Sequence, residues 1–164
     1  YLDHDPVLAA EAMCNKHVVK MILESAQLLC TAHHMLDTGL VYSQKVKLYK
    51  TTHINHPASK WTRSRTSHYN WLSNHALALC REYTYRYNKI HKSQSLIEYC
   101  LQNPPLIDMC GCMLAPPQCM PDEYKMEDVV AAYRRYYIEC KRNTIQMKWT
   151  RRKPPSWWDM YVNK

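Results

Sequence analysis

Four polar side chains interrupt the otherwise apolar segment 15–29 at a spacing that could serve chemistry: His17, Lys20, Glu24 and Gln27. At about 100° per residue on an α-helix, they fall within roughly 80° of one another and form one polar stripe. An imidazole, an amine and a carboxylate are groups used for proton transfer and nucleophilic attack. The stripe therefore faces a cleft or a partner, or else it is a solvated helix face with a Lys20–Glu24 pair. Lysine before glutamate is the weaker order for such a surface pair.

The helix that carries this stripe belongs to a chain of 164 residues, which is long enough for one domain with its own core. Two glycines, nine prolines and 46% apolar residues favour a helical protein over a β-sandwich, which needs many more turn residues. We therefore predict an all-α fold, a single compact helical domain over residues 1–164. It should have about four to five helices with long basic and proline-rich loops.

Capping residues and apolar spacing give the bounds of the expected helices. Asp5 followed by Pro6 opens a first helix that runs to about Met35 and ends over 37–39. The arc opposite the polar stripe should be buried. It consists of Val18, Val19, Ile22, Leu23, Ala26, Leu29 and Cys30.

Four more helices and an irregular tail complete the expected arrangement. The tail, 148–161, should pack through its tryptophans. The helices are a short one that begins at the NHP motif (55–57) around Trp61, one from about His68 to Tyr87 capped by Thr66 or Ser67, a short one with a Ser95–Glu98 capping box that stops at Asn103, Pro104 and Pro105, and a last one from Asp128 to about Arg142.

Eight cysteines raise the question of disulfides or bound metal. Five lie within helical patterns as small buried hydrophobes, which favours a reducing compartment: Cys14, Cys30, Cys80, Cys100 and Cys140. The other three could bind zinc with a histidine, but their spacing favours a loop with free thiols: Cys110, Cys112 and Cys119. We expect no metal. No run of 18 apolar residues occurs, so we expect no membrane span.

The positive charge is concentrated in two stretches without acidic residues. The net charge is +8, and neither 38–81 nor 141–158 contains Asp or Glu. Basic residues interleaved with aromatic rings are typical of a protein that binds phosphates and stacks on bases, although a merely basic surface is the alternative. The residues predicted to bind nucleic acid, duplex or single-stranded, are Lys45, Lys47, Lys50, His56, Lys60, Arg63, Arg65, Arg151, Arg152, Trp157 and Trp158.

The segment KHVVKMILESAQLL resembles the first-helix signature of the bacteriophage-type pyrimidine-dimer DNA glycosylases. In that family a histidine is followed seven residues later by the catalytic glutamate, and the matching residues here are His17 and Glu24. The aromatic tail WWDMY is also similar to the aromatic C-terminus of that family. Over most of its length the chain resembles more closely a group of phage-encoded proteins that share YLDHDP, KHVVKM, NHP before Trp61, EYTYRY and KWT.

The resemblance implies a glycosylase coupled to an AP-lyase, which acts on damaged pyrimidines through an amine that forms a Schiff base. Glu24 would be catalytic, with His17 and Lys20 beside it. In the family the amine belongs to an N-terminal threonine, whereas this sequence begins at Tyr1. The family's arginines near the glutamate are replaced by Leu23 and Gln27, and Lys20 is a partial substitute that would contact a phosphate or act as the amine.

The implied chemistry needs DNA as partner and no cofactor, in the reducing cytoplasm of a host cell. A second hypothesis is a non-catalytic nucleic-acid-binding or virion-associated protein with the same fold. A third is a structural subunit of a larger assembly, which needs only apolar helices and exposed aromatic residues. DNA binding separates the third hypothesis from the first two, and covalent trapping separates the first from the second.

Overall fold

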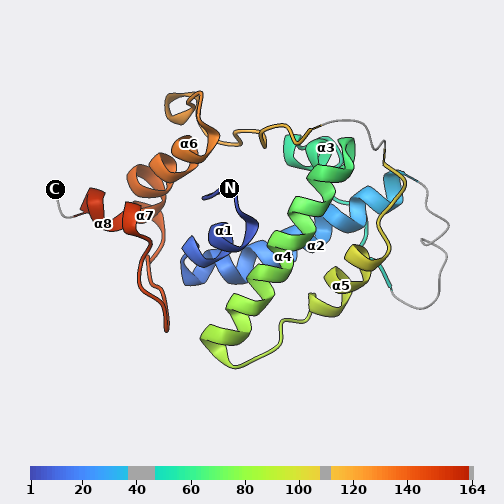
Figure 1. Ribbon diagram of the computed structural model, residues 1–164, viewed down its shortest axis with the longest axis horizontal. Coiled ribbons are helices and arrows are strands. Elements are labelled where there is room, and N and C mark those ends of the chain that lie inside the picture. Colours follow the sequence, from blue (N-terminus) through green and yellow to red (C-terminus); the bar gives the residue numbers. More distant parts are fainter. Residues whose placement is uncertain (37–46, 108–111, 163–164) are drawn as a thin grey trace.

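The computed structural model describes residues 1–36, 47–107 and 112–162, and this part of the chain contains helices and no strand. The all-α prediction is therefore confirmed. Figure 1 shows α4 (Thr66–Tyr87) running through the centre, with α3 (Pro57–Ser64) and α5 (Gln94–Gln102) toward one end and the C-terminal helices at the other. The predicted helix end over 37–39, and the candidates Lys45 and Cys110, lie outside the described residues.

The first predicted helix is divided in two. α1 (Pro6–Ala12) begins at Asp5, whose side chain accepts hydrogen bonds from two backbone N–H groups of the first turn, as the sequence predicted. α2 (Asn15–Met35) begins only after Met13 and Cys14, which have extended backbone. The prediction of one continuous helix is wrong at this point.

Side chains from distant segments hold the break between α1 and α2. Arg86 donates hydrogen bonds to the carbonyl oxygens of Glu11 and Met13, at 3.0 and 2.7 Å. Trp149 Nε1 donates to the carbonyl oxygen of Ala12 at 3.0 Å. Carbonyls freed at a helix end need partners when they are buried. The periodicity of one segment carries no information about partners from α4 and the tail, so the pattern could not show the break.

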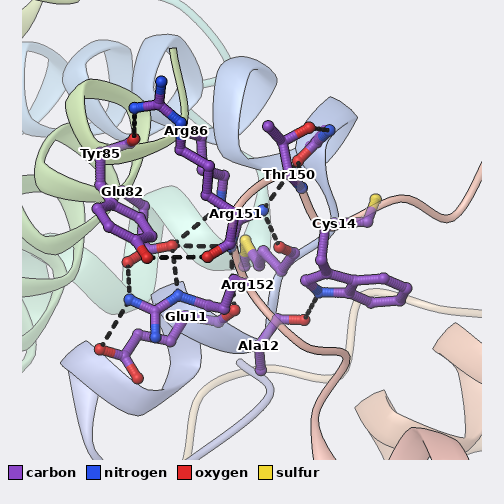
Figure 2. Close-up of polar contacts among 12 residues, drawn as sticks. Glu11, Ala12, Cys14, Glu82, Tyr85, Arg86, Thr150, Arg151 and Arg152 are labelled. Carbon is purple, nitrogen blue, oxygen red and sulfur yellow. Dashed lines mark hydrogen bonds and ion pairs between the residues drawn. The ribbon is translucent and has the colours of Figure 1, made fainter. Parts of the chain in front are cut away.

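Arg86 belongs to a buried ionic network that joins α1, α4 and the tail (Figure 2). Its guanidinium pairs with Glu82 at 2.8 Å, with side-chain exposures of 0% and 6%. Arg152 pairs with the same carboxylate and with Glu11, the latter at 3.3 Å. Figure 2 also shows Arg151, which donates to the backbone carbonyl of Tyr85 at 3.0 Å.

The core forms where α4 packs against α1, α2, α3 and α5. One face of α4 points toward the neighbouring helices and is buried at Tyr69, Leu72, Ala76 and Leu79. The largest fully buried side chains of this cluster include Ile22, Leu29, Tyr69, Leu79 and Ile97.

Two of the predicted caps are wrong. α4 begins at Thr66, directly after Arg65, because only that residue separates it from α3. Neither Thr66 nor Ser67 therefore precedes the helix as a cap. α5 begins at Gln94, before the predicted Ser95, and Glu98 accepts a hydrogen bond from the Gln94 side chain at 2.9 Å.

The last predicted helix has a change of winding within it. Asp128 caps α6 (Val129–Tyr136) as predicted, and the chain continues through the π-helix η3 (Tyr137–Lys141) into α7 (Arg142–Thr144). A short 3₁₀ turn, η2 (Asp122–Tyr124), precedes α6.

The tail packs inward as predicted but is not wholly irregular. It contains α8 (Ser156–Val162). Trp149, Trp157 and Trp158 are 9%, 8% and 8% exposed, which confirms that the tail is held through its tryptophans. Figure 1 shows α6, α7 and α8 gathered at the same end of the molecule.

Candidate functional site

The polar stripe of α2 lines a cavity of about 400 Å³. A cavity of this size is typical of small-molecule sites, which measure roughly 300 to 1,000 Å³. Of the alternatives that the sequence left open, a stripe that faces a cleft agrees with this arrangement. The α2 residues in its wall are His17, Lys20, Met21, Glu24, Ser25, Gln27 and Leu28.

The opposite arc of α2 is less buried than the sequence pattern predicted. Val18, Ile22 and Ala26 are fully buried, but Val19 and Leu23 are 40% and 43% exposed. Leu23 lies at the edge of the arc, and nothing in the sequence pattern distinguishes Val19 from its buried neighbours. The prediction of burial is wrong for these two residues.

A hydrogen bond to Tyr137 determines which ring nitrogen of His17 carries the proton. Its Nδ1 lies 2.7 Å from the hydroxyl of Tyr137, and that hydroxyl accepts the backbone N–H of Cys14 at 2.9 Å. The Tyr137 proton is therefore free to be donated to Nδ1, which leaves His17 with its proton on Nε2. Burial lowers the pKa of His17 to about 4, with smaller contributions from Lys141 and Lys20. His17 is thus a neutral imidazole at pH 7.

Glu24 and Lys20 form an ion pair on the cavity wall. Lys20 Nζ lies 3.2 Å from Glu24 Oε1, with side-chain exposures of 67% and 42%. An ion pair this exposed contributes about 0 to 1 kcal/mol to stability, so stability gives little reason for its presence. The carboxylate and the amine stand one helical turn apart, close enough to exchange a proton.

Another part of the cavity wall comes from the C-terminal half, and the sequence analysis missed it. Tyr133, Tyr136, Tyr137 and Lys141 all line the cavity from α6 and η3. Lys141 Nζ lies 4.8 Å from the centre of the Tyr136 ring. The signal in the sequence is the spacing of four residues between Tyr133, Tyr137 and Lys141, which places them on one helix face.

Three histidines also line the cavity. His53 and His56 reach it from the segment before α3, and His75 reaches it from α4. His56 also caps α3, because its Nδ1 accepts the backbone N–H of Ala58 at 3.2 Å. Burial lowers the pKa of His75 to about 4, so it too is neutral at pH 7. The sequence analysis chose only His56 of these three.

The basic segment 47–60 leads directly into this wall. Lys47, Lys50 and Lys60 are exposed. Arg63 is partly exposed and donates to the carbonyl oxygen of Ile54 at 2.8 Å. Arg65, between α3 and α4, is also partly exposed. The predicted basic residues of this stretch therefore lie on elements that border the cavity.

The tail residues that were predicted to contact nucleic acid do not lie exposed beside the cavity as the residues of the basic segment do. Arg152 is held by Glu82 and Glu11, and Arg151 by the backbone of Tyr85. Trp157 and Trp158 are each 8% exposed, so neither ring is available to a base in this arrangement. The sequence analysis gave these tryptophans both a packing role and a base-stacking role, and the structure shows the packing role.

The cysteines are consistent with packing and loop positions. Cys14, Cys30, Cys80 and Cys100 are buried and free, Cys140 is partly buried, and Cys112 and Cys119 are exposed. Within the described ranges no group of three metal-ligating side chains comes together. No helix of the described chain is long and apolar enough to cross a membrane.

Fold and site together define a class: an all-helical protein whose basic segment leads into a cavity with carboxylate, amine and imidazole groups. The sequence model of the pyrimidine dimer DNA glycosylase family matches residues 3–95, more than half of the chain, and the chain belongs to this family. A DNA glycosylase-type repair function and a DNA substrate follow at the level of the family. No curated protein sequence and no solved structure matches the chain significantly.

Proposed function

We propose that the protein is a DNA glycosylase and AP-lyase that acts on damaged pyrimidines, with Glu24, His17 and Lys20 at its reaction centre. The observation that carries this proposal is the polar stripe of α2 in the cavity wall. The stripe lies within the segment that matches the family. A reaction at C1′ of a sugar requires the nucleotide to leave the base stack, and the cavity offers a volume for it.

The amine begins the reaction. Its nitrogen attacks C1′ of the deoxyribose, and the bond from C1′ to the base breaks, with the electron pair and then a proton going to the base. Opening of the sugar ring leaves an iminium between C1′ and the amine. Loss of a proton from C2′ then expels the 3′-phosphate and cuts the strand, and water finally releases the amine.

Two sources of the amine are compatible with the site. An α-amino group has a pKa near 8 and is unprotonated far more often at neutral pH than an ordinary lysine. Lys20 is the alternative, because Glu24 lies 3.2 Å away and can take its proton. The mass of the native protein identifies the residue that carries the α-amino group and is measured first.

Glu24 would have the second role in the proposed reaction, beside the amine. A carboxylate beside C1′ stabilises positive charge that develops on the sugar, and it can move a proton between amine and ring oxygen. Neutral His17 can donate its Nε2–H to a sugar or phosphate oxygen. Lys47, Lys50 and Lys60, together with Arg63 and Arg65, would hold the phosphates of the duplex. Leu23 and Gln27 stand at the positions of the family's arginines, so Lys20 would contact a phosphate there if the α-amino group is the nucleophile.

The experiment is cleavage of ultraviolet-irradiated duplex DNA by the wild type and by Glu24→Gln. The substitution conserves shape, so folding and DNA binding should persist while cleavage falls about 10²- to 10⁴-fold. The matched control is Glu139→Gln, since Glu139 also forms an ion pair with a residue one turn away and has a side-chain exposure of 47%. The control should cleave like the wild type. DNA binding without cleavage by the wild type would favour the non-catalytic hypothesis instead.

A further inference from the structure

Tyr137 joins the C-terminal half of the chain to the beginning of α2. It is the first residue of the π-helix η3 and is 5% exposed. Its ring packs edge-on against Trp157 and Trp158, with centroids 6.2 and 6.3 Å apart. Its hydroxyl contacts the backbone N–H of Cys14 at 2.9 Å and His17 Nδ1 at 2.7 Å. Single π-helical turns are rare and often occur at functional sites, so the role of this tyrosine needs an explanation beyond packing.

The proton of the Tyr137 hydroxyl has one strong acceptor within the described chain. That acceptor is His17 Nδ1, because the other group beside the hydroxyl, the Cys14 thiol, is a weak acceptor. If Nδ1 carried the imidazole proton instead, the hydroxyl would accept two N–H groups and its own proton would have only the thiol. The hydrogen bonds are therefore best satisfied when His17 carries its proton on Nε2.

The Nε2–H of His17 belongs to the cavity wall. His17 lines the cavity, and no residue of the described ranges forms a hydrogen bond with its Nε2. The rings of His17 and Tyr137 lie 5.0 Å apart between centroids, so the tyrosine also restrains the imidazole plane. Lys20 and Lys141 line the same cavity. An N–H donor beside two ammonium groups suits an anionic oxygen, to which hydrogen bonds are strongest.

A second pair of tyrosine and histidine in the fold shows what such a pair does away from the cavity. Tyr69 is fully buried, and its hydroxyl lies 2.9 Å from His33 Nε2 and donates to the carbonyl oxygen of Cys100 at 3.0 Å. Neither Tyr69 nor His33 lines the cavity. The Tyr69–His33 pair is thus a core contact with the same chemistry, and it provides a matched control for Tyr137.

We propose that Tyr137 is a positioning residue of the reaction centre: its hydroxyl holds His17 in the tautomer that presents Nε2–H to a phosphate oxygen of the DNA. The inference rests on the proposed glycosylase function. It adds a residue that lies outside the segment 3–95 that matches the family. Tyr137 acts only through His17 and contacts no substrate atom itself.

The first test reads the tautomer directly, by nuclear magnetic resonance of the imidazole nitrogens at pH 7. The signals of His17 are assigned by their loss in His17→Gln. In the wild type they should show a neutral ring with its proton on Nε2, and in Tyr137→Phe a mixture of both tautomers. Tyr69→Phe should leave the His17 signals unchanged. Wild-type signals for His17 in Tyr137→Phe would overturn the inference.

The second test is a double-mutant cycle on the cleavage of ultraviolet-irradiated duplex DNA. Tyr137→Phe should lower kcat/KM about tenfold, the effect of one lost hydrogen bond. His17→Gln removes the imidazole on which Tyr137 acts, so Tyr137→Phe should cause no further loss in that background. Tyr69→Phe should cleave like the wild type even where its Tm falls as far as that of Tyr137→Phe.

The outcomes separate the inference from the function on which it rests. Losses from Tyr137→Phe and His17→Gln that multiply in the double variant would overturn the inference, because the tyrosine would then act independently of His17. An equal loss in Tyr69→Phe would overturn it too, since the effect would come from general destabilisation. A wild type that leaves irradiated DNA uncut would overturn the proposed function itself, and the inference with it.

Discussion

Replacement of Glu82 by glutamine tests how the α1–α2 break is held. The Glu82 carboxylate is 6% exposed and pairs with Arg86, which is fully buried, and with Arg152. The substitution keeps the volume but removes the negative charge. The Arg86 charge then remains buried opposite three neutral acceptors: the carbonyls of Glu11 and Met13 and the side chain of Asn15.

The expected loss of stability in Glu82→Gln follows from these contacts. Removal of one partner from a buried ion pair costs about 3 to 5 kcal/mol. Because Arg86 keeps neutral acceptors and Arg152 keeps Glu11, we expect the lower end, about 3 kcal/mol of the free energy of unfolding. For a chain of this size, that corresponds to a Tm lower by about 6 to 12 °C.

The assay is urea unfolding followed by circular dichroism, with a thermal scan beside it. Glu139→Gln removes a carboxylate from an exposed pair with Arg135 and serves as the control. The control should lose no more than about 1 kcal/mol. If the free energy of unfolding of Glu82→Gln falls no further below the wild-type value than that of the control does, the ionic network does not hold the break between α1 and α2.

Two further predictions concern pH and salt. Burial lowers the pKa of His17, His33 and His75 to about 4 from 6.5, so between these values the unfolded chain binds protons that the folded chain does not. The free energy of unfolding should therefore fall as the pH drops from 6.5 to 4, and urea titrations at several pH values would show this; a flat profile would contradict the burial of these rings. Lys47→Gln and Lys50→Gln should each reduce the slope of log affinity for duplex DNA against log salt by about 0.9. The control is the exposed Lys92, whose substitution should leave the slope unchanged, and an unchanged slope in all three would remove the basic segment from the DNA interface.

Local signals predicted the helices well where a side chain acts on its own backbone. Asp5 and Asp128 both cap the helices that were expected of them, and the polar stripe of α2 was visible from spacing alone. The break at Met13 and Cys14 was not predictable in this way, because Arg86 and Trp149 come from segments more than 70 residues away.

The candidate site was predicted on one wall only. Its α2 wall follows from the 3.6-residue period of a single helix. The wall with Tyr137 and Lys141 depends on how the C-terminal half docks, and the position of His75 depends on the packing of α4 against α1. The pattern of charged and aromatic residues predicted that Arg152 and Trp157 contact nucleic acid. In the structure Arg152 forms an ion pair with Glu82 and Trp157 is buried in the core, and composition alone does not show these contacts.

Reduction with borohydride on ultraviolet-irradiated DNA tests the central claim most directly. An iminium between the protein and C1′ is reduced to a stable amine, so a covalent complex of protein and DNA should accumulate only when the reductant is present. Peptide mass mapping should then find the cross-link at the native α-amino group or at Lys20. A protein that binds the irradiated duplex but gives no covalent complex under these conditions would contradict the Schiff-base mechanism.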